Sequence, residues 1–216
     1  KNFIGFNITI PYKENFIGLC DKVTARAKKI GSVNLTYKKN NLVYGDNTDV
    51  LGFNKTFNFL KIKNTRSVLM IGAGGAARAI LYYLNKKSIE NIDIFATSTK
   101  RKKDLSKKFK FKNFLTKSSH LKKRYDLIIN ASSAGMSKDN KINRNILYLV
   151  KKASGVIDIV YNPIETELLK EANKYNVKSS SGLKMLVEQA KPSYEKWCGN
   201  KIKIDDEIYQ KLLRNI

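Results

Sequence analysis

The chain has 216 residues, enough for one large domain or two small ones, and 42% of them are hydrophobic. No stretch approaches the roughly 18 continuous apolar residues that cross a bilayer, and no secretory signal is recognisable, so we expect a cytoplasmic globular protein without a membrane partner. Lys and Arg number 42 against 18 Asp and Glu, a net charge of +24 that would attract polyanions, but they are spread along the whole chain without a nucleic-acid-binding motif. This distribution favours a solvated basic surface over a nucleic-acid site.

The first thirty residues are predicted to combine one strand with two short helices. Alternating apolar and polar residues predict a strand over residues 4–10, and a helix can follow over residues 12–20. A second helix over residues 21–29 is expected to be capped by Asp21 and ended by Gly31.

A hairpin and a helix are predicted next. Two β-rich runs, residues 32–37 and 41–45, flank a turn-forming segment that contains two asparagines. Apolar residues then recur at helical spacing over residues 50–60. Asp49 is therefore expected at or just before the start of this helix.

After residue 60 the pattern alternates between strands and helices. Strands are expected at residues 67–71, 91–95, 126–130 and 155–160, and helices at residues 76–86, 100–109, 142–152 and 165–175. This βαβ alternation is typical of an α/β protein with a Rossmann-like, doubly wound parallel sheet. Two more helices are predicted over residues 182–199 and 204–216, with Pro192 as a bend or boundary.

No metal site is predicted. Cys20 and Cys198 are the only cysteines and lie far apart, each without a second cysteine or a histidine nearby, so both are expected to be reduced and structural. His120 is the only histidine and lies in a lysine-rich stretch, where we expect it to be exposed to solvent.

A glycine-rich loop follows the first of the alternating strands and opens a helix. Its sequence, Gly72-Ala73-Gly74-Gly75-Ala76-Ala77, allows a tight turn and a close approach of the backbone to a ligand, while small residues let the helix pack on the strand. A pyrophosphate could bind at this helix N-terminus. A glycine-rich turn without a ligand is the alternative.

The end of the second alternating strand indicates which dinucleotide is preferred. NAD-specific folds place a carboxylate there for the ribose 2′-hydroxyl. This chain has Thr97, Ser98 and Thr99 followed by four basic residues, among them Lys102, and these can bind a 2′-phosphate. The sequence therefore favours NADP, with NAD possible, unless the basic run is only the solvated start of a helix.

Seven sequence blocks occur in a fixed order. They are residues 7–13 (NITIPYK), 30–34 (IGSVN), 45–49 (GDNTD), the glycine loop, 130–136 (NASSAGM), 158–163 (DIVYNP) and 182–190 (GLKMLVEQA). In these blocks the whole chain resembles the shikimate dehydrogenase family. The resemblance implies reversible reduction of 3-dehydroshikimate to shikimate with NADPH, a step toward the aromatic amino acids.

The resemblance also implies roles for individual residues. Lys13 would be the general acid/base at the reacting oxygen and Asp49 its partner; without the resemblance, two such residues would more often form a surface ion pair. Family members would use the amides and hydroxyls of matching residues to bind the substrate, here Asn7, Thr9, Asn34, Tyr161 and Gln189. The coenzyme would contact Gly72, Ala73, Gly74, Gly75, Ala76, Thr97, Ser98, Thr99, Lys102, Gly182 and Met185, although Met185 could equally be a core residue.

The expected organisation is two lobes. Residues 1–49 and 182–216 would form a smaller α/β substrate domain, and residues 50–181 the NADP-binding domain. Family members carry a further strand and a Ser-x-Ser segment before the first block, which this sequence is expected to lack, so the substrate domain would be incomplete.

Several alternatives stay open. Ser98 stands where the family usually has an arginine for the 2′-phosphate, which leaves room for NAD. A quinate/shikimate dehydrogenase that uses NAD is therefore one alternative, and a dinucleotide-binding remnant without catalysis is another. A monomer and a homodimer are both compatible with the sequence.

Overall fold

The computed structural model describes residues 4–214, and its larger sheet is built after residue 60. The strands are β5 (Val68–Ile71), β6 (Ile92–Phe95), β7 (Asn113–Leu115), β8 (Leu127–Asn130), β9 (Gly155–Asp158) and β10 (Lys178–Ser180). All are parallel, in the order β10-β9-β8-β5-β6-β7, so the direction of winding reverses between β5 and β8. The predicted doubly wound sheet is confirmed.

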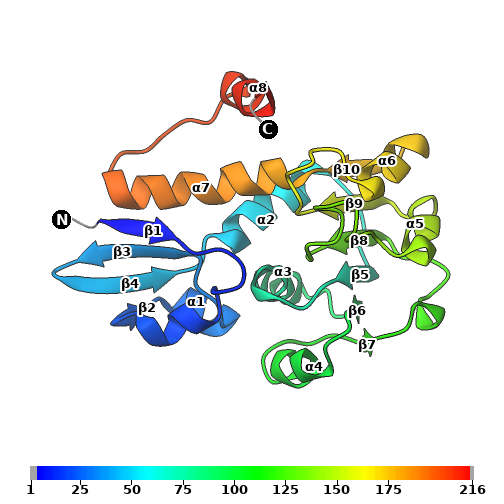
Figure 1. Cartoon of the computed structure of the whole chain (residues 1–216), viewed down its shortest axis with the longest axis horizontal. Helices are drawn as coiled ribbons and strands as arrows, with labels where there is room; N and C mark the ends of the chain where they lie inside the picture. The colour runs from blue at the N-terminus through cyan, green and yellow to red at the C-terminus, as the bar shows by residue number, and fades with distance from the viewer. Residues whose placement is uncertain (1–3, 215–216) are drawn as a thin grey trace.

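Helices cover both faces of this sheet. They are α3 (Gly75–Lys86), α4 (Thr99–Ser106), α5 (Arg144–Val150) and α6 (Glu167–Lys174). Figure 1 shows α3 and α4 on the side that faces the smaller sheet, and α5 and α6 on the opposite side. A separate apolar cluster fills each interface, as expected for strands that are buried on both faces.

The smaller sheet is built before residue 47. It contains β1 (Gly5–Asn7), β2 (Lys22–Val23), β3 (Leu35–Lys39) and β4 (Leu42–Asp46), in the order β1-β3-β4-β2. The predicted hairpin is formed by β3 and β4, which are antiparallel. Asn40 and Asn41 have φ angles of 49° and 59° at its tip, a conformation that asparagine tolerates better than most residues.

Two of the early helix predictions are wrong in detail. Only a 3₁₀ turn, η1 (Asn15–Leu19), forms where a helix over residues 12–20 was expected. The next helix, α1 (Ala25–Ile30), is capped by Thr24, whose hydroxyl accepts a hydrogen bond from Ala27 N. Asp21 is not its cap, because its carboxylate accepts a hydrogen bond from Val43 N at the edge of the hairpin.

Two long helices connect the sheets, and a shorter one follows. They are α2 (Asp49–Phe59), α7 (Gly182–Cys198) and α8 (Asp206–Arg214); α2 begins at Asp49 as predicted. Figure 1 shows α2 and α7 crossing above the space between the two sheets. No helix in the described part of the chain is long and apolar enough to cross a membrane.

Pro192 does not end α7. The helix continues through it because tertiary contacts hold the residues on both sides. Before the proline, Gln189 binds Asn34, and after it the indole N–H of Trp197 donates to Thr36 O at 2.8 Å. Of the two possibilities predicted for Pro192, a bend or a boundary, the boundary is therefore wrong.

Candidate active site

The structure brings Lys13 and Asp49 together, although they lie 36 positions apart. Lys13 belongs to the turn between β1 and η1, and Asp49 is the first residue of α2. Lys13 Nζ lies 2.7 Å from Asp49 Oδ2, with side-chain exposures of 14% and 5%. A lysine amino group held by a carboxylate in a largely buried position can accept a proton from a bound hydroxyl as the amine, or donate one to a carbonyl oxygen as the ammonium.

A network of amides and hydroxyls surrounds the carboxylate of Asp49. Asn34 Nδ2 donates to Asp49 Oδ1 at 2.9 Å and to Gln189 Oε1 at 3.0 Å. The same amide contacts Thr48 Oγ1 at 2.9 Å, and Asn34 Oδ1 accepts from Thr48 N at 2.7 Å. Three separate segments, before β3, at the start of α2 and within α7, thus meet at Asn34.

Asn7 extends this network to the end of β1. Its side-chain amide donates to Asn34 O at 3.0 Å and to Ser193 Oγ at 3.3 Å. Ser193 also lies 3.3 Å from Thr48 Oγ1. Sequence reasoning did not assign roles to Thr48 and Ser193. Two signals were available, because Thr48 precedes Asp49 and Ser193 lies one helical turn after Gln189.

Two residues predicted to bind the substrate lie outside this network. Thr9 is exposed, and its carbonyl oxygen accepts from Tyr12 N at 3.0 Å. Tyr161 follows β9 and is 41% exposed. Their predicted roles therefore depend on the resemblance and not on contacts within the described residues.

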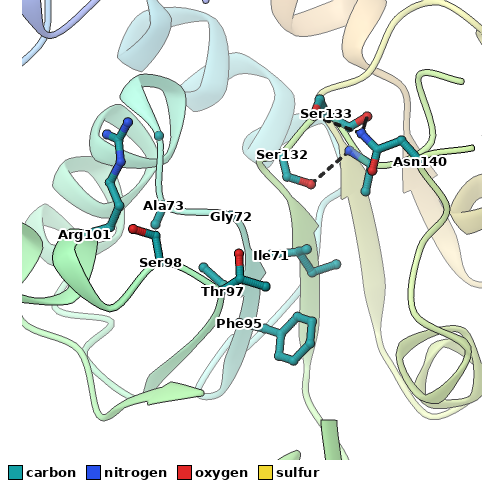
Figure 2. Close-up of a pocket in the computed structure, with 13 residues that line it drawn as sticks. Ile71, Gly72, Ala73, Phe95, Thr97, Ser98, Arg101, Ser132, Ser133 and Asn140 are labelled. Carbon is teal, nitrogen blue, oxygen red and sulfur yellow. Dashed lines mark hydrogen bonds between the residues drawn. The ribbon is translucent and has the colours of Figure 1, made fainter. Parts of the chain in front are cut away.

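A second functional region is a cavity of about 380 Å³ at the carboxyl ends of β5, β6 and β8. It lies where the winding of the sheet reverses, which is the usual ligand site of such folds. Figure 2 shows that most of its lining residues lie at or just after these three strand ends, while Arg101 comes from the helix after β6 and Asn140 from the loop after β8. Five residues predicted to bind the coenzyme line it, namely Gly72, Ala73, Gly74, Thr97 and Ser98.

The glycine loop fits a dinucleotide. Gly72 has a φ of +100°, and a Cβ there would lie 2.8 Å from Ala131 O, so the tight turn requires glycine. A Cβ at Gly74 would meet nothing within 4 Å, which leaves open space for a ligand. Gly74 caps α3 without a side-chain hydrogen bond, so backbone N–H groups of Gly75 and Ala76 in the first turn can bind phosphate oxygens.

The basic start of α4 lies beside the same cavity. Ser98 is the residue that caps α4, and Thr99 is the first residue of this helix. Lys102 is exposed and does not line the cavity, whereas Arg101 does. Arg101 was not singled out from the sequence, because four consecutive cations leave the choice among them open.

The remaining two residues predicted to contact the coenzyme are at the start of α7. Gly182 is buried, and a Cβ there would lie 2.1 Å from Ile159 O. Met185 is 5% exposed and belongs to the main apolar cluster.

Asp158 supports one wall of the cavity. Its carboxylate accepts from Thr166 Oγ1 at 2.6 Å, Asn130 Nδ2 at 2.9 Å and Val160 N at 3.0 Å. Burial raises the pKa of Asp158 to about 6, although these hydrogen bonds act to lower it. Asn130 Oδ1 in turn accepts from Ser132 Oγ at 2.7 Å, so the network positions a residue that lines the cavity.

Neither cysteine nor the histidine lines the cavity at the glycine loop. Cys20 is partly buried, Cys198 is exposed, and neither is in a disulfide. His120 is exposed, as predicted. Among residues 4–214, no group of three or more His, Cys, Asp and Glu side chains could hold a metal ion.

Comparison with known proteins relates the whole chain to one family. Residues 1–36 match the shikimate dehydrogenase substrate binding domain, and residues 55–179 match the shikimate/quinate 5-dehydrogenase family. A shikimate dehydrogenase (NADP(+)) from Caldanaerobacter subterraneus subsp. tengcongensis is 37% identical over 96% of this chain and 76% of its own length.

Solved structures agree with this assignment. Shikimate 5-dehydrogenase from Thermus thermophilus, in complex with NADP(H) and shikimate, is 26% identical with a TM-score of 0.79, over 100% of this chain and 80% of that one. Quinate dehydrogenase from Corynebacterium glutamicum, in complex with NAD, is 27% identical with a TM-score of 0.85, over 99% of this chain and 78% of that one. With these matches, and with the Lys13–Asp49 pair and the cavity at the glycine loop, this chain belongs to the shikimate dehydrogenase family.

Proposed function

We propose that this chain catalyses the reversible NADPH-dependent reduction of 3-dehydroshikimate to shikimate, with Lys13 as general acid/base. The observation that carries the proposal is the Lys13–Asp49 pair, with 2.7 Å between Nζ and Oδ2. This pair adjoins the coenzyme loop, because a Cβ at Gly75 would lie 2.9 Å from Lys13 Cβ. The proton-exchanging group and the dinucleotide cradle are thus close enough to act on one small substrate.

The chemistry divides between the coenzyme and the protein. NADP, when bound, accepts or supplies the hydride. As a neutral amine, Lys13 removes the proton from the reacting hydroxyl during oxidation and becomes an ammonium, and as an ammonium it returns a proton to the oxygen during reduction. Asp49 orients the ammonium and keeps its charge close to the oxygen where negative charge develops.

The amides of Asn7, Asn34 and Gln189 are proposed to bind the hydroxyl groups of the substrate. An amide offers both donors and an acceptor, which suits a ring that carries several hydroxyls. Thr9 and Tyr161 are proposed to complete the pocket, and their exposed positions leave both side chains accessible.

The coenzyme is proposed to bind across the cavity at the strand ends. Residues 72–76 would hold the pyrophosphate, and Thr97, Ser98, Thr99 and Lys102 would bind the 2′-phosphate. Gly182 and Met185 would lie on the nicotinamide side. The cavity volume of about 380 Å³ and the open space at Gly74 support this arrangement.

We also infer the domain organisation and the cellular setting. Residues 1–49 and 182–216 would form the substrate domain and residues 50–181 the NADP-binding domain. Cytoplasmic location is supported by two unpaired cysteines, which suit a reducing compartment. A monomer or a homodimer is proposed, which light scattering would distinguish.

Quinate oxidation with NAD is the second candidate. It is favoured by Ser98, because a serine at this strand end offers no positive charge to a 2′-phosphate. The similarity to a quinate dehydrogenase also favours it. The same assay that tests the first proposal separates the two, because each substrate can be offered with each coenzyme.

The experiment is shikimate-dependent reduction of NADP, followed by absorbance, with quinate and NAD as alternatives. We expect shikimate with NADP to be the preferred pair, and Lys13→Ala to lower kcat by about 10²- to 10⁴-fold. The control is Lys107→Ala, which also replaces a lysine by alanine and removes one positive charge, but at an exposed position. Activity that survives in Lys13→Ala would refute the role of Lys13, and a folded chain without any dehydrogenase activity would support the non-catalytic alternative.

A further inference from the structure

Glu14, the residue after Lys13, forms ion pairs with two arginines that belong to helices of the larger sheet. Its Oε2 lies 2.9 Å from Arg78 Nη2 on α3, and its Oε1 pairs with Arg101 Nη1 on α4. Glu14 itself lies between β1 and η1, on the side of the smaller sheet. One carboxylate thus joins the segment that carries Lys13 to both helices that frame the coenzyme cavity.

The two arginines differ in their surroundings. The side chain of Arg78 is 7% exposed, and its Nε has no hydrogen-bond partner among the described residues, so Glu14 compensates a buried charge. The side chain of Arg101 is 39% exposed and lines the coenzyme cavity. Figure 2 shows its guanidinium extending away from Thr97 and Ser98.

Neighbouring contacts fix the same stretch of backbone. Lys13 O accepts from Val33 N at 2.7 Å, which attaches the lysine to its own sheet. Across the interface, Ser32 Oγ donates to Gly75 O at 3.2 Å, beside the close approach of Lys13 to Gly75. These contacts involve uncharged groups. The ion pairs of Glu14 add a charged link between the Lys13 segment and the helices α3 and α4.

We propose that Glu14 is a positioning residue that sets the place of the Lys13 ammonium relative to the coenzyme by bridging Arg78 and Arg101. This inference rests on the proposed function and adds a residue to it. Arg78 is the fixed anchor of the bridge because it is buried, and Arg101 connects the bridge to the cavity wall. Misplacement of a catalytic group by about 1 Å can cost about 100-fold in rate, so loss of the bridge should affect turnover.

The test is Glu14→Gln, which keeps the shape of the side chain and removes its charge. We expect kcat for shikimate oxidation to fall by about 10- to 100-fold, with the stoichiometry and affinity of NADPH binding unchanged within about threefold. Glu14→Asp retains the carboxylate and should restore part of the lost kcat. The matched control is Glu90→Gln, which removes an exposed carboxylate paired with Lys110 and should leave kcat unchanged.

A second variant, Arg101→Met, tests the bridge without changing Glu14, and a double-mutant cycle with Glu14→Gln tests whether the bridge acts as a unit. Arg101→Met removes one arm of the bridge and leaves the Arg78–Glu14 pair in place. If the bridge acts as a unit, Glu14→Gln combined with Arg101→Met will lower kcat no further than Glu14→Gln alone. Independent, additive losses would overturn the proposal, as would a Glu14→Gln variant with a kcat within about twofold of the parent chain.

Hydrogen exchange separates this proposal from the proposed function, because it requires no turnover. Glu14→Gln should speed amide exchange in η1 and at Arg78 N, which donates to Gly74 O at 3.2 Å at the start of α3, whereas Glu90→Gln should not. Unchanged exchange would overturn the bridge even in an active enzyme. A parent chain without dehydrogenase activity would instead refute the proposed function.

Discussion

Asn34 donates a hydrogen bond to Asp49 Oδ1 at 2.9 Å, which is the carboxylate oxygen that Lys13 does not contact. Both oxygens of Asp49 therefore have a partner, and the carboxylate is fixed in the plane that these two contacts define. Since Asn34 also contacts Gln189, the orientation of the acid/base pair depends on the position of α7.

Replacement of Asn34 by alanine should impair catalysis and stability together. Asn34→Ala leaves Thr48 N and Asp49 Oδ1 buried without these partners, at a cost of about 1–3 kcal/mol in the free energy of unfolding. We expect kcat/KM for shikimate to fall by about 10- to 100-fold while NADPH affinity is retained. Steady-state kinetics and urea unfolding measure both effects. Asn58→Ala, at an exposed position on α2, is the control, and an equal loss there would contradict the prediction.

Two glycines of the coenzyme loop should respond differently to alanine. At Gly72 the φ of +100° and the contact with Ala131 O make Gly72→Ala strained, with a loss of about 1–3 kcal/mol in stability. At Gly74 the added methyl group meets nothing within 4 Å, so Gly74→Ala should fold normally but obstruct the phosphates. Thermal unfolding and NADPH titration of both variants check this. Tight NADPH binding by Gly74→Ala would refute the phosphate position.

The stability of the protein should carry a pH dependence that originates at Asp158. Its pKa rises from an ordinary value of 3.8 to about 6 in the folded chain, so the folded state favours the protonated carboxyl group. The stabilisation is complete below pH 3.8 and is lost as the pH rises through 6, a change of about 3 kcal/mol. Asp158→Asn cannot titrate. The difference in unfolding free energy, parent minus variant, should fall by this amount between about pH 4 and pH 7, and a flat difference would contradict the assigned pKa.

The close crossing of α2 and α7 should tolerate no larger residue at Gly52. A Cβ there would lie 2.5 Å from Met185 O and 2.9 Å from Gln189 Cβ, so Gly52→Ala must push the helices apart. We expect a loss of about 1–3 kcal/mol in stability and a higher KM for shikimate, because Gln189 moves away from Asn34. Gly18→Ala is the control, since a Cβ at Gly18 meets nothing within 4 Å. An unchanged KM in folded Gly52→Ala would show that the substrate does not depend on this crossing.

Local sequence patterns predicted the elements that are long or fully buried. Every residue of β5, β8 and β9 is buried and most of them are apolar, which is the strongest signal that a parallel sheet leaves in a sequence. The strands β2, β7 and β10 have only two or three residues each, too few to show a period, and they were missed.

The site could be predicted in part for a similar reason. Its glycine loop is contiguous in sequence and follows a recognisable strand, so dinucleotide binding could be predicted from spacing, whereas the roles of Lys13 and Asp49 were implied only by the family resemblance. The bridge from Glu14 to Arg101 joins residues 87 positions apart, and no local pattern marks such a pair. Within a chain of net charge +24, one functional arginine also looks like any other cation.

The contact between Trp197 and Thr36 joins residues 161 positions apart and has a consequence for biogenesis. Closing so long a loop costs more chain entropy than pairing neighbouring strands, so contacts of this kind tend to form late. On the ribosome, the strands that carry the glycine loop and the cavity, β5, β6 and β8, are synthesised well before α7. A nascent chain would therefore form the coenzyme cavity before Gln189 can reach Asn34. The ability to recognise the substrate would be the last property that the chain acquires.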